Sequence, residues 1–362
     1  MDIISLLKTL SETSGVSGYE DRVREAVIEV FGRYADEVRT DALGNVIALK
    51  RGTNEMNEME PRRSIMLAGH TDEIGLMITQ IEKGFLHFTE VGGFDPRVLL
   101  GQEVVVHGKR DLPGIIGSRP PHVLPPEERE KTIPMDKLFI DVGLPPDEVT
   151  ALVRVGDLVT VQRELTPLQG DFVAGKAFDD RTAVVAIAAC LEQLAGMRHT
   201  WDVYAVGTSQ EEVGLRGAIT SAYGLAPDVG IAIDVTFGDQ PGIPAADTVE
   251  MNKGPALVYG PNIHPVLYEA LVETAKSLEL PYQVEPAPGR TGTDAWAIQV
   301  TRSGIPTALI GIPLRNMHTS VETVSVKDVE RTGRLLAAFI ARLDAEFMHR
   351  LAWRPAEAPE EK

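Results

Sequence analysis

The motif Thr208-Ser209-Gln210-Glu211-Glu212-Val213-Gly214 lies near the middle of the chain, directly after the apolar run 203–207. The run predicts a buried strand, and a helix is expected to begin near Leu215. Two adjacent carboxylates therefore stand at the C-terminal end of a strand, where open α/β sheets bind their ligands. Because neighbouring side chains point in different directions, Glu211 and Glu212 can have different roles: one can hold a metal ion while the other transfers a proton.

An isolated Glu-Glu pair is more often a solvated acidic turn, so its interpretation depends on the other strand ends. The apolar segment 64–69 ends in His70-Thr71-Asp72. Residues i and i+2 of an extended segment share a face, so His70 and Asp72 can point into one site. A further apolar segment, 229–233, ends in Asp234. Several predicted strands are thus followed by residue types that bind metals or transfer protons.

Two more candidate positions stand near predicted element ends. Asp179 and Asp180 precede a strongly apolar helix expected over residues 183–194. Carboxylates are common at helix starts because the helix dipole favours them. This effect explains the presence of one of the two aspartates, and the other is a candidate metal ligand. The pattern does not say which of the two is the ligand. The last predicted strand, 307–310, leads to His318. In a mainly parallel sheet these strand ends converge on one edge.

That edge would carry more negative charge than it could hold without cations. Two divalent ions a few ångströms apart would resolve this, with a bridging carboxylate, terminal histidine and carboxylate ligands, and a bound water whose pKa they lower. Nitrogen and oxygen ligands without thiolates suit zinc, cobalt or manganese. One remaining carboxylate would act as the base on the water. The sequence therefore predicts a dinuclear metal centre that activates water.

The α/β pattern is interrupted between about residues 74 and 163, where helical periodicity nearly vanishes and short β-rich runs alternate with Gly and Pro. This predicts a small β-barrel or sandwich inserted into an α/β domain. We expect an α/β fold with a mixed, mostly parallel sheet flanked by helices and an inserted β-barrel. We expect the catalytic domain to consist of residues 1–72 and 168–352. The inserted barrel is expected over residues 73–167, and a frayed tail over residues 353–362.

Local patterns near the N-terminus predict a capped helix and a loop. Ser17 is expected to cap a helix that runs to about Tyr34, because Glu20 follows it at the spacing of a capping box. The polar stretch over residues 51–63 predicts an exposed loop.

The composition limits the compartment and the partners. Of 362 residues 43% are hydrophobic and 24% charged, as in ordinary globular proteins, and the formal net charge of -18 argues against nucleic acid and anionic membranes as partners. No apolar run approaches the ~20 residues of a membrane helix, and residues 1–10 lack the pattern of a secretory signal. The single cysteine, Cys190, rules out an intrachain disulfide framework. We therefore expect a cytoplasmic protein.

A series of short motifs extends over nearly the whole length of the chain. They are Gly15-Val16-Ser17-Gly18-Tyr19-Glu20, Asp41-Ala42-Leu43-Gly44-Asn45, Gly69-His70-Thr71-Asp72-Glu73-Ile74-Gly75, Lys176-Ala177-Phe178-Asp179-Asp180-Arg181, Glu211-Glu212-Val213-Gly214, Asp234, Gly292-Thr293-Asp294-Ala295 and Arg315-Asn316-Met317-His318-Thr319. Each motif is weak alone, but their order and spacing are specific. In these motifs the chain resembles the cytosolic dinuclear aminopeptidases, the family that includes glutamyl aminopeptidase and the tetrahedral (deblocking) aminopeptidases.

The resemblance implies a metal-dependent aminopeptidase that removes the N-terminal residue of short peptides with a free N-terminus, with two divalent metal ions, zinc, cobalt or manganese, in each subunit. It also implies a role for each candidate residue: His70 and Asp234 as terminal ligands of one metal, Glu212 and His318 as terminal ligands of the other, Asp179 as the bridging ligand, Glu211 as the general base and Asp72 as the carboxylate that orients His70. Many relatives have tyrosine where this chain has Asn316, which affects the substrate pocket rather than the metal site.

The resemblance further implies that the inserted β domain drives assembly into a homo-oligomer, a dodecamer built from dimers. The Pro-rich segment around His122 predicts an exposed loop. We hypothesise that this loop lies at a subunit contact or near the entrance of the active site.

Three alternatives remain open from the sequence. An endoglucanase would need two carboxylates that flank a glycosidic bond at ~5 to 9 Å, and it would leave the histidines without a role. A metal-dependent amidase or deacylase acting on N-acyl amino acids could use the same metal site. A non-catalytic scaffold of the same fold would not need a complete set of ligands. For the first residue of the substrate, we expect an aliphatic or broad preference.

Overall fold

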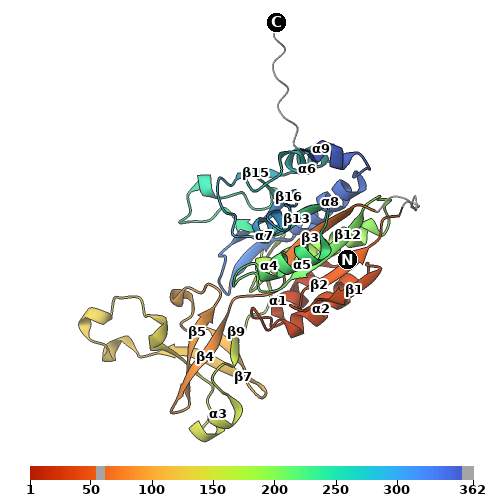
Figure 1. Cartoon of the computed structure of the whole chain (residues 1–362). Coiled ribbons are helices and arrows are strands. Elements are labelled where there is room, and N and C mark those ends of the chain that lie inside the picture. Colours follow the sequence, from red (N-terminus) through yellow and green to blue (C-terminus); the bar gives the residue numbers. More distant parts are fainter. Residues whose placement is uncertain (54–61, 353–362) are drawn as a thin grey trace.

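The computed structural model describes residues 1–53 and 62–352. The expected frayed tail and most of the expected loop over residues 51–63 lie outside the described residues. Figure 1 shows an α/β body formed by the N-terminal and C-terminal parts of the chain, and a separate β-barrel formed by the segment between them. Within the described part, no helix is long and apolar enough to cross a membrane.

A mixed, 11-stranded sheet forms the centre of the α/β body, in the order β1-β2-β12-β3-β13-β16-β17-β11-β10, with β14 beside β16 and β15 beside β14. The neighbouring strands β12, β3, β13 and β16 are parallel, whereas the pairs toward both edges are antiparallel. The strands are β1 Glu37–Thr40, β2 Val46–Lys50, β3 Ser64–His70, β10 Thr166–Pro167, β11 Phe172–Gly175, β12 Asp202–Thr208, β13 Val229–Phe237, β14 Ala256–Tyr259, β15 Gln283–Pro286, β16 Thr307–Arg315 and β17 Glu322–Ser325.

Helices cover both faces of this sheet, which is why its central strands are apolar throughout. Residues 65–68 of β3, for example, are completely buried. One hydrophobic cluster joins the sheet to α1 (Ile3–Glu12), α2 (Asp21–Gly32), α4 (Phe178–Leu194), α6 (Pro265–Ser277), α8 (Val326–Ala341) and α9 (Phe347–Leu351). A second cluster, on the other face, joins it to α5 (Arg216–Leu225) and α7 (Asp294–Gln299). The predicted class, a mixed sheet flanked by helices, is confirmed.

The predicted β-barrel is also confirmed. It is a closed barrel in the order β4-β5-β8-β7-β6-β9 and has its own hydrophobic cluster. Its elements are β4 Gly75–Glu82, β5 Phe85–Val91, β6 Glu103–His107, β7 Asp111–Ser118, β8 Leu138–Asp141, β9 Leu158–Val161 and α3 Pro146–Leu152. Strand β10 already pairs with β11 of the large sheet, so the barrel strands end a few residues before the expected boundary at residue 167. We propose that the two separate cores correspond to two domains.

The order of connections creates a crevice at the end of β3. From β3 the chain passes through the barrel and α4 to β12 on one side of β3, and then through α5 to β13 on the other side. β3 pairs with β12 as far as His70, opposite Thr208, but with β13 only as far as Ala68, opposite Ala232. The two neighbours of β3 thus diverge at its C-terminal end, the place where α/β sheets bind ligands.

Two local predictions differ from the structure. Asp234 does not end its strand: β13 continues to Phe237, and Asp234 lies just beyond the last pair with β3. Ser17 does not cap α2, which begins at Asp21 with no side-chain cap hydrogen bond. The Ser17 hydroxyl instead donates to Asp72 Oδ2 at 2.5 Å. A buried carboxylate gains more from this donor than a solvent-exposed helix end does.

Gly69 is the contact point between β3 and α4, and its substitution tests this packing. A Cβ atom there would lie 2.7 Å from Ala183 Cβ and 3.3 Å from Asp180 Oδ2. We expect Gly69→Ala to lower the free energy of unfolding by about 1–3 kcal/mol, because overpacking pushes the helix and the strand apart. Urea denaturation in the presence of a chelator measures the change without a contribution from bound metal.

Gly224 in α5 is the matched control. A Cβ atom there meets nothing within 4 Å. Gly224→Ala should be neutral or should stabilise the fold, since alanine has the higher helix propensity. Equal effects of the two substitutions would show that the close approach of α4 to β3 does not limit this position.

Candidate metal centre

A cavity of about 360 Å³ opens at the C-terminal ends of the central strands. The structure brings every predicted metal ligand and the predicted base into its lining. These residues are His70 at the end of β3, Asp179 at the start of α4, Glu211 and Glu212 in the loop after β12, Asp234 in β13 and His318 in the loop after β16. A larger cavity of about 630 Å³, beside α6 and α9, has no carboxylate in its lining and cannot supply this chemistry.

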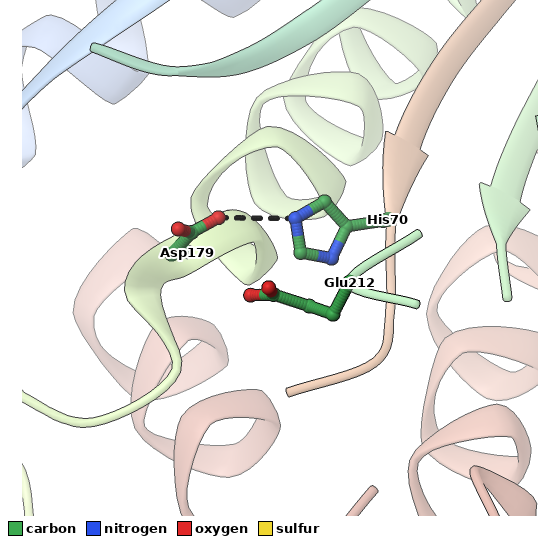
Figure 2. Close-up of side chains that lie close together, drawn as sticks. All are labelled: His70, Asp179 and Glu212. Carbon is green, nitrogen blue, oxygen red and sulfur yellow. Dashed lines mark hydrogen bonds and ion pairs between the residues drawn. The ribbon is translucent and has the colours of Figure 1, made fainter. Parts of the chain in front are cut away.

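Asp179 holds the central position in this group. Its Oδ1 atom lies 3.0 Å from Nε2 of His70, and its Oδ2 atom lies 3.2 Å from Nε2 of His318. The same His318 nitrogen is 3.4 Å from Oε1 of Glu212. Figure 2 shows the side chains of His70, Asp179 and Glu212 converging from separate segments. A carboxylate whose two oxygens face two different imidazoles has the arrangement expected of a bridging ligand.

The backbone at the start of α4 separates the two adjacent aspartates. Asp179 and Asp180 both have non-helical φ and ψ angles, and the peptide bond between them is cis. As a result Asp179 lines the cavity, whereas Asp180 is completely buried and accepts a hydrogen bond from the backbone N–H of His70 at 3.2 Å. Among the described residues, Asp180 Oδ1 has no hydrogen-bond partner. The geometry therefore separates the two aspartates in space, with Asp179 in the lining of the cavity and Asp180 buried behind it.

Asp72 lies behind the cavity and organises two segments at once. Its two carboxylate oxygens accept the backbone N–H groups of Glu211, at 3.0 Å, and Glu212, at 3.1 Å. His70 Nδ1 is closer to the backbone carbonyl of Asp72, at 3.1 Å, than to its carboxylate, at 3.5 Å. The backbone carbonyl of Asp72 thus holds Nδ1 of His70, and its carboxylate holds the loop that carries the predicted base.

Glu322 is a buried site residue that the sequence analysis missed. Its Oε2 atom accepts the backbone N–H of Phe178, at 2.7 Å, and of Asp179, at 3.2 Å, while its Oε1 atom accepts the backbone N–H of His318 at 2.9 Å. One side chain thus holds two cavity residues that are distant in the sequence. Burial raises the pKa of Glu322 to about 8. No sequence signal marked this role, because Glu322 begins the short strand β17, whose sequence Glu-Thr-Val-Ser contains no apolar run.

A buried ion-pair group anchors the same region, and it was also missed. Glu73 Oε2 lies 2.5 Å from Lys176 Nζ, and Glu73 Oε1 lies 3.3 Å from Arg181 Nη2. Arg181 is completely buried and also donates to the backbone carbonyls of Leu10, Thr13 and Thr71. Because Arg181 belongs to α4, these bonds connect α4 to α1 and to the end of β3.

The electrostatics of the cluster follow from its burial. Burial raises the pKa of Glu211 to about 10 and raises the pKa of Asp234 well above its ordinary value, since low polarity disfavours the charged form. The pKa of His318 rises to about 11, chiefly through its hydrogen bond with Asp179. Burial also opposes charge on Asp179, but the hydrogen bonds with His318 and His70 lower the pKa of Asp179 below its usual range.

The residues present fit a centre of divalent metal ions. The ligand atoms of His70, Asp179 and Glu212 lie within 4.8 Å of one another, and so do those of His70, Asp180 and Asp234. The free oxygen of Asp180 and the raised pKa values both indicate a site that needs more positive charge than the protein supplies. Imidazole and carboxylate donors are the set that zinc, cobalt and manganese accept.

Two further residues from the sequence analysis lie away from this cavity. Asn316 is exposed and has a positive φ of 56°, which asparagine tolerates better than most residues, and it does not line the cavity. His122 lies in a short 3-10 helix, Pro121–Val123, of the barrel loop and is exposed. Its suggested place at a subunit contact or at the entrance stays a hypothesis.

Comparisons with known proteins agree with this picture. The family model described as M42 glutamyl aminopeptidase matches residues 44–335. The chain is similar to a lysyl aminopeptidase of Pyrococcus furiosus, with 38% identity over 93% of this chain and 96% of the relative. It is also similar to two solved structures. One is a TET aminopeptidase from a marine sediment archaeon of the Thaumarchaeota, with TM-score 0.90, 39% identity and coverage of 97% and 99%. The other is the Pyrococcus horikoshii TET1 peptidase, which can assemble into a tetrahedron or a large octahedral shell, with TM-score 0.82, 32% identity and coverage of 94% and 100%.

Metal should stabilise the folded protein, because it binds only the folded state and offsets the repulsion between buried carboxylates. We expect the thermal midpoint to rise by roughly 5–10 °C when zinc, cobalt or manganese is restored after chelation. Asp179→Asn should reduce this gain by at least half without lowering the midpoint of the metal-free protein. Differential scanning calorimetry measures both, with the exposed Asp171→Asn as control. A full metal-dependent gain in Asp179→Asn would contradict a bridging position.

Glu322→Gln tests the backbone support of the site. Glutamine would place an amide NH₂ group against one of the backbone N–H donors, so either Asp179 or His318 would lose its support. Isothermal titration calorimetry should show metal affinity reduced by roughly 10- to 100-fold, the usual effect of changing a residue that holds a ligand. Glu330→Gln, on the partly exposed face of α8, is the control. Unchanged affinity in Glu322→Gln would mean that the strands alone position the ligands.

Proposed function

Because the chain belongs to the M42 glutamyl aminopeptidase family and is a metal-dependent aminopeptidase, we propose that it binds two divalent metal ions and uses Glu211 as its general base. His70 and Asp234 would hold one ion, Glu212 and His318 would hold the other, and Asp179 would contribute to both sites. The observation that carries the proposal is the geometry of Asp179, whose two oxygens face the Nε2 atoms of His70 and His318 at 3.0 and 3.2 Å.

When bound, the ions supply a Lewis acid for the scissile carbonyl and lower the pKa of water. Glu211 takes a proton from the attacking water, whose oxygen bonds to the carbonyl carbon of the first peptide bond. As the C–N bond breaks, Glu211 delivers that proton to the leaving amine. Its position supports this role, since it lines the cavity with Oε2 3.9 Å from His70 Nε2. Asp72 is a positioning residue, because it holds the backbone N–H of Glu211.

We assign zinc or cobalt as the metal, with manganese as a further candidate. The donor set supports this choice, because it combines imidazole nitrogens with carboxylate oxygens and includes no thiolate. The only cysteine, Cys190, is buried in α4 within the hydrophobic core. A single thiol also supports a location in the reducing cytoplasm.

We propose a homo-oligomer, a dodecamer built from dimers, that acts on short peptides with a free N-terminus. The separate barrel domain and the resemblance to a peptidase that forms closed shells support this assembly. The net charge of -18 supports the absence of nucleic acid and membrane as partners. The names of the relatives, lysyl and glutamyl, leave the preferred first residue open.

Glu211→Gln tests the mechanism directly. Removal of a general base typically costs ~10²–10⁴ in rate, so kcat on aminoacyl 4-nitroanilides should fall by that factor while the bound metal is retained. Metal content is measured by atomic emission spectroscopy on the same samples. Activity of the wild type should disappear after chelation and return with zinc, cobalt or manganese.

The exposed Glu273→Gln serves as the control and should leave both kcat and metal content unchanged. Acetylating the α-amine of the substrate should abolish turnover. Faster turnover of acylated than of free-amino substrates would instead identify an amidase that uses the same metal centre. Metal loss in Glu211→Gln would make Glu211 a ligand rather than the base.

A further inference from the structure

A carboxylate without a role in this mechanism lies in the same cavity as the metal-ligating residues. Glu285, in β15, is half-buried and lies near Thr236, which also lines this cavity. Its Oε2 atom is buried and has no hydrogen-bond partner among residues 1–53 and 62–352. Burying a carboxylate oxygen without a donor costs free energy, and a cationic ligand would recover that cost.

The register of the sheet explains why Glu285 faces the metal centre. Asp234 on β13 pairs with Gly311 on β16, and Gly311 leaves the space above the strand open. A Cβ atom on Gly311 would lie 2.8 Å from Thr236 Cγ2 and 3.2 Å from Glu285 Oε2. The Glu285 carboxylate therefore lies over Gly311. That position is roughly one strand spacing, about 4.8 Å, from the strand that carries Asp234.

The rest of this pocket is mainly apolar. Val258 and Leu309 are buried and line it, and Phe237 stands at its exposed rim. Glu285 of β15 pairs with Val258 of β14. The residue before Val258, Leu257, pairs with Ile310 of β16. The strands under this part of the cavity are therefore continuous from β15 to β16. A cavity wall that combines apolar side chains with a carboxylate suits a long aliphatic side chain with a terminal cation, since the aliphatic stem packs against the wall while the cation pairs with the carboxylate.

The cavity also contains a positive charge, Arg290. Its guanidinium lies 4.7 Å from the centroid of the Trp296 ring, and its side chain is exposed, so water and salt screen it. Glu285 is the less exposed of the two charges. Because charges interact more strongly where water is excluded, Glu285 discriminates more strongly between substrates than Arg290 does.

We propose that Glu285 selects peptides whose first residue is lysine or arginine. The inference rests on the aminopeptidase function, which brings the first side chain of the peptide beside the metal-ligating residues. A leucine side chain would pack against this wall and leave Glu285 unpaired, and a glutamate side chain would meet a like charge. The pocket thus favours a basic first residue over the aliphatic or broad preference expected from the sequence.

Lysine and norleucine substrates isolate this effect, because their side chains have the same carbon chain and differ in the terminal ammonium group. We would measure kcat/KM for lysyl and norleucyl 4-nitroanilides with wild type, Glu285→Gln and the control Glu273→Gln, all loaded with the same metal. The wild type should prefer the lysyl substrate. Glu285→Gln should lower the lysyl-to-norleucyl ratio by roughly 10- to 100-fold, and Glu273→Gln should leave it unchanged.

Other results would overturn the inference. An equal fall for both substrates in Glu285→Gln would mean that Glu285 holds the α-amine common to them. An unchanged lysyl-to-norleucyl ratio would mean that the ammonium group does not reach Glu285. A preference for glutamyl substrates would mean that Arg290, rather than Glu285, determines the selectivity. Binding of L-lysine and L-norleucine, measured by calorimetry, makes the same comparison without turnover, so a failure of catalysis is separated from a failure of selection. Equal affinities there would also overturn it.

Discussion

The concentration of buried carboxylates at one edge of the sheet is the constraint to which the rest of the structure responds. Asp179, Glu211 and Asp234 share a cavity with few cations of the protein's own. Such a group is unstable as a set of bare charges, since like charges in a site of low polarity repel strongly. Burial raises the pKa values of Glu211 and Asp234, and neighbouring carboxylates add to the rise. Metal ions resolve it, and the fold supplies the rigid frame in which they can do so.

The carboxylates around the cavity divide into two kinds according to what they accept. Asp72 and Glu322 accept backbone N–H groups with both oxygens, and these bonds commit them to holding the chain in place. Asp179 and Glu212 are instead directed at histidine side chains, which leaves their lone pairs available to a cation. The carboxylates that accept backbone N–H groups thus determine the orientation of the carboxylates that face the histidines. We propose that only the second kind contacts the metal, so that substitution of the first kind acts through the position of the second.

Site residues could be predicted from the sequence where they follow predicted strands. They could not be predicted where their role depends on contacts with residues far away in the chain. His70 and Asp234 were proposed as ligands because apolar runs mark strands and the ends of parallel strands converge, and both line the cavity, although β13 continues past Asp234. Ser17 was assigned to a cap because the local pattern fits one, but the buried carboxylate of Asp72, in the loop after β3, provides the stronger partner. Glu322 and Glu285 gave no signal, because one acts through backbone groups far away in the chain and the other through a pocket formed by four strands.

The proposed metal ligand Asp234 and the proposed selective residue Glu285 belong to the same sheet, which has a physical consequence. Asp234 and Thr236 stand on the same face of β13, and Gly311 of the next strand keeps the space beside them open. Asp234, the proposed ligand, and Thr236, which lies near Glu285, therefore belong to one rigid strand. Because hydrogen-bonded strands keep their spacing, the fold fixes the distance from Asp234 to the carboxylate that we propose as selective. A side chain of the right length and charge then positions its own peptide bond for attack, which is how binding energy remote from the reacting bond can serve catalysis.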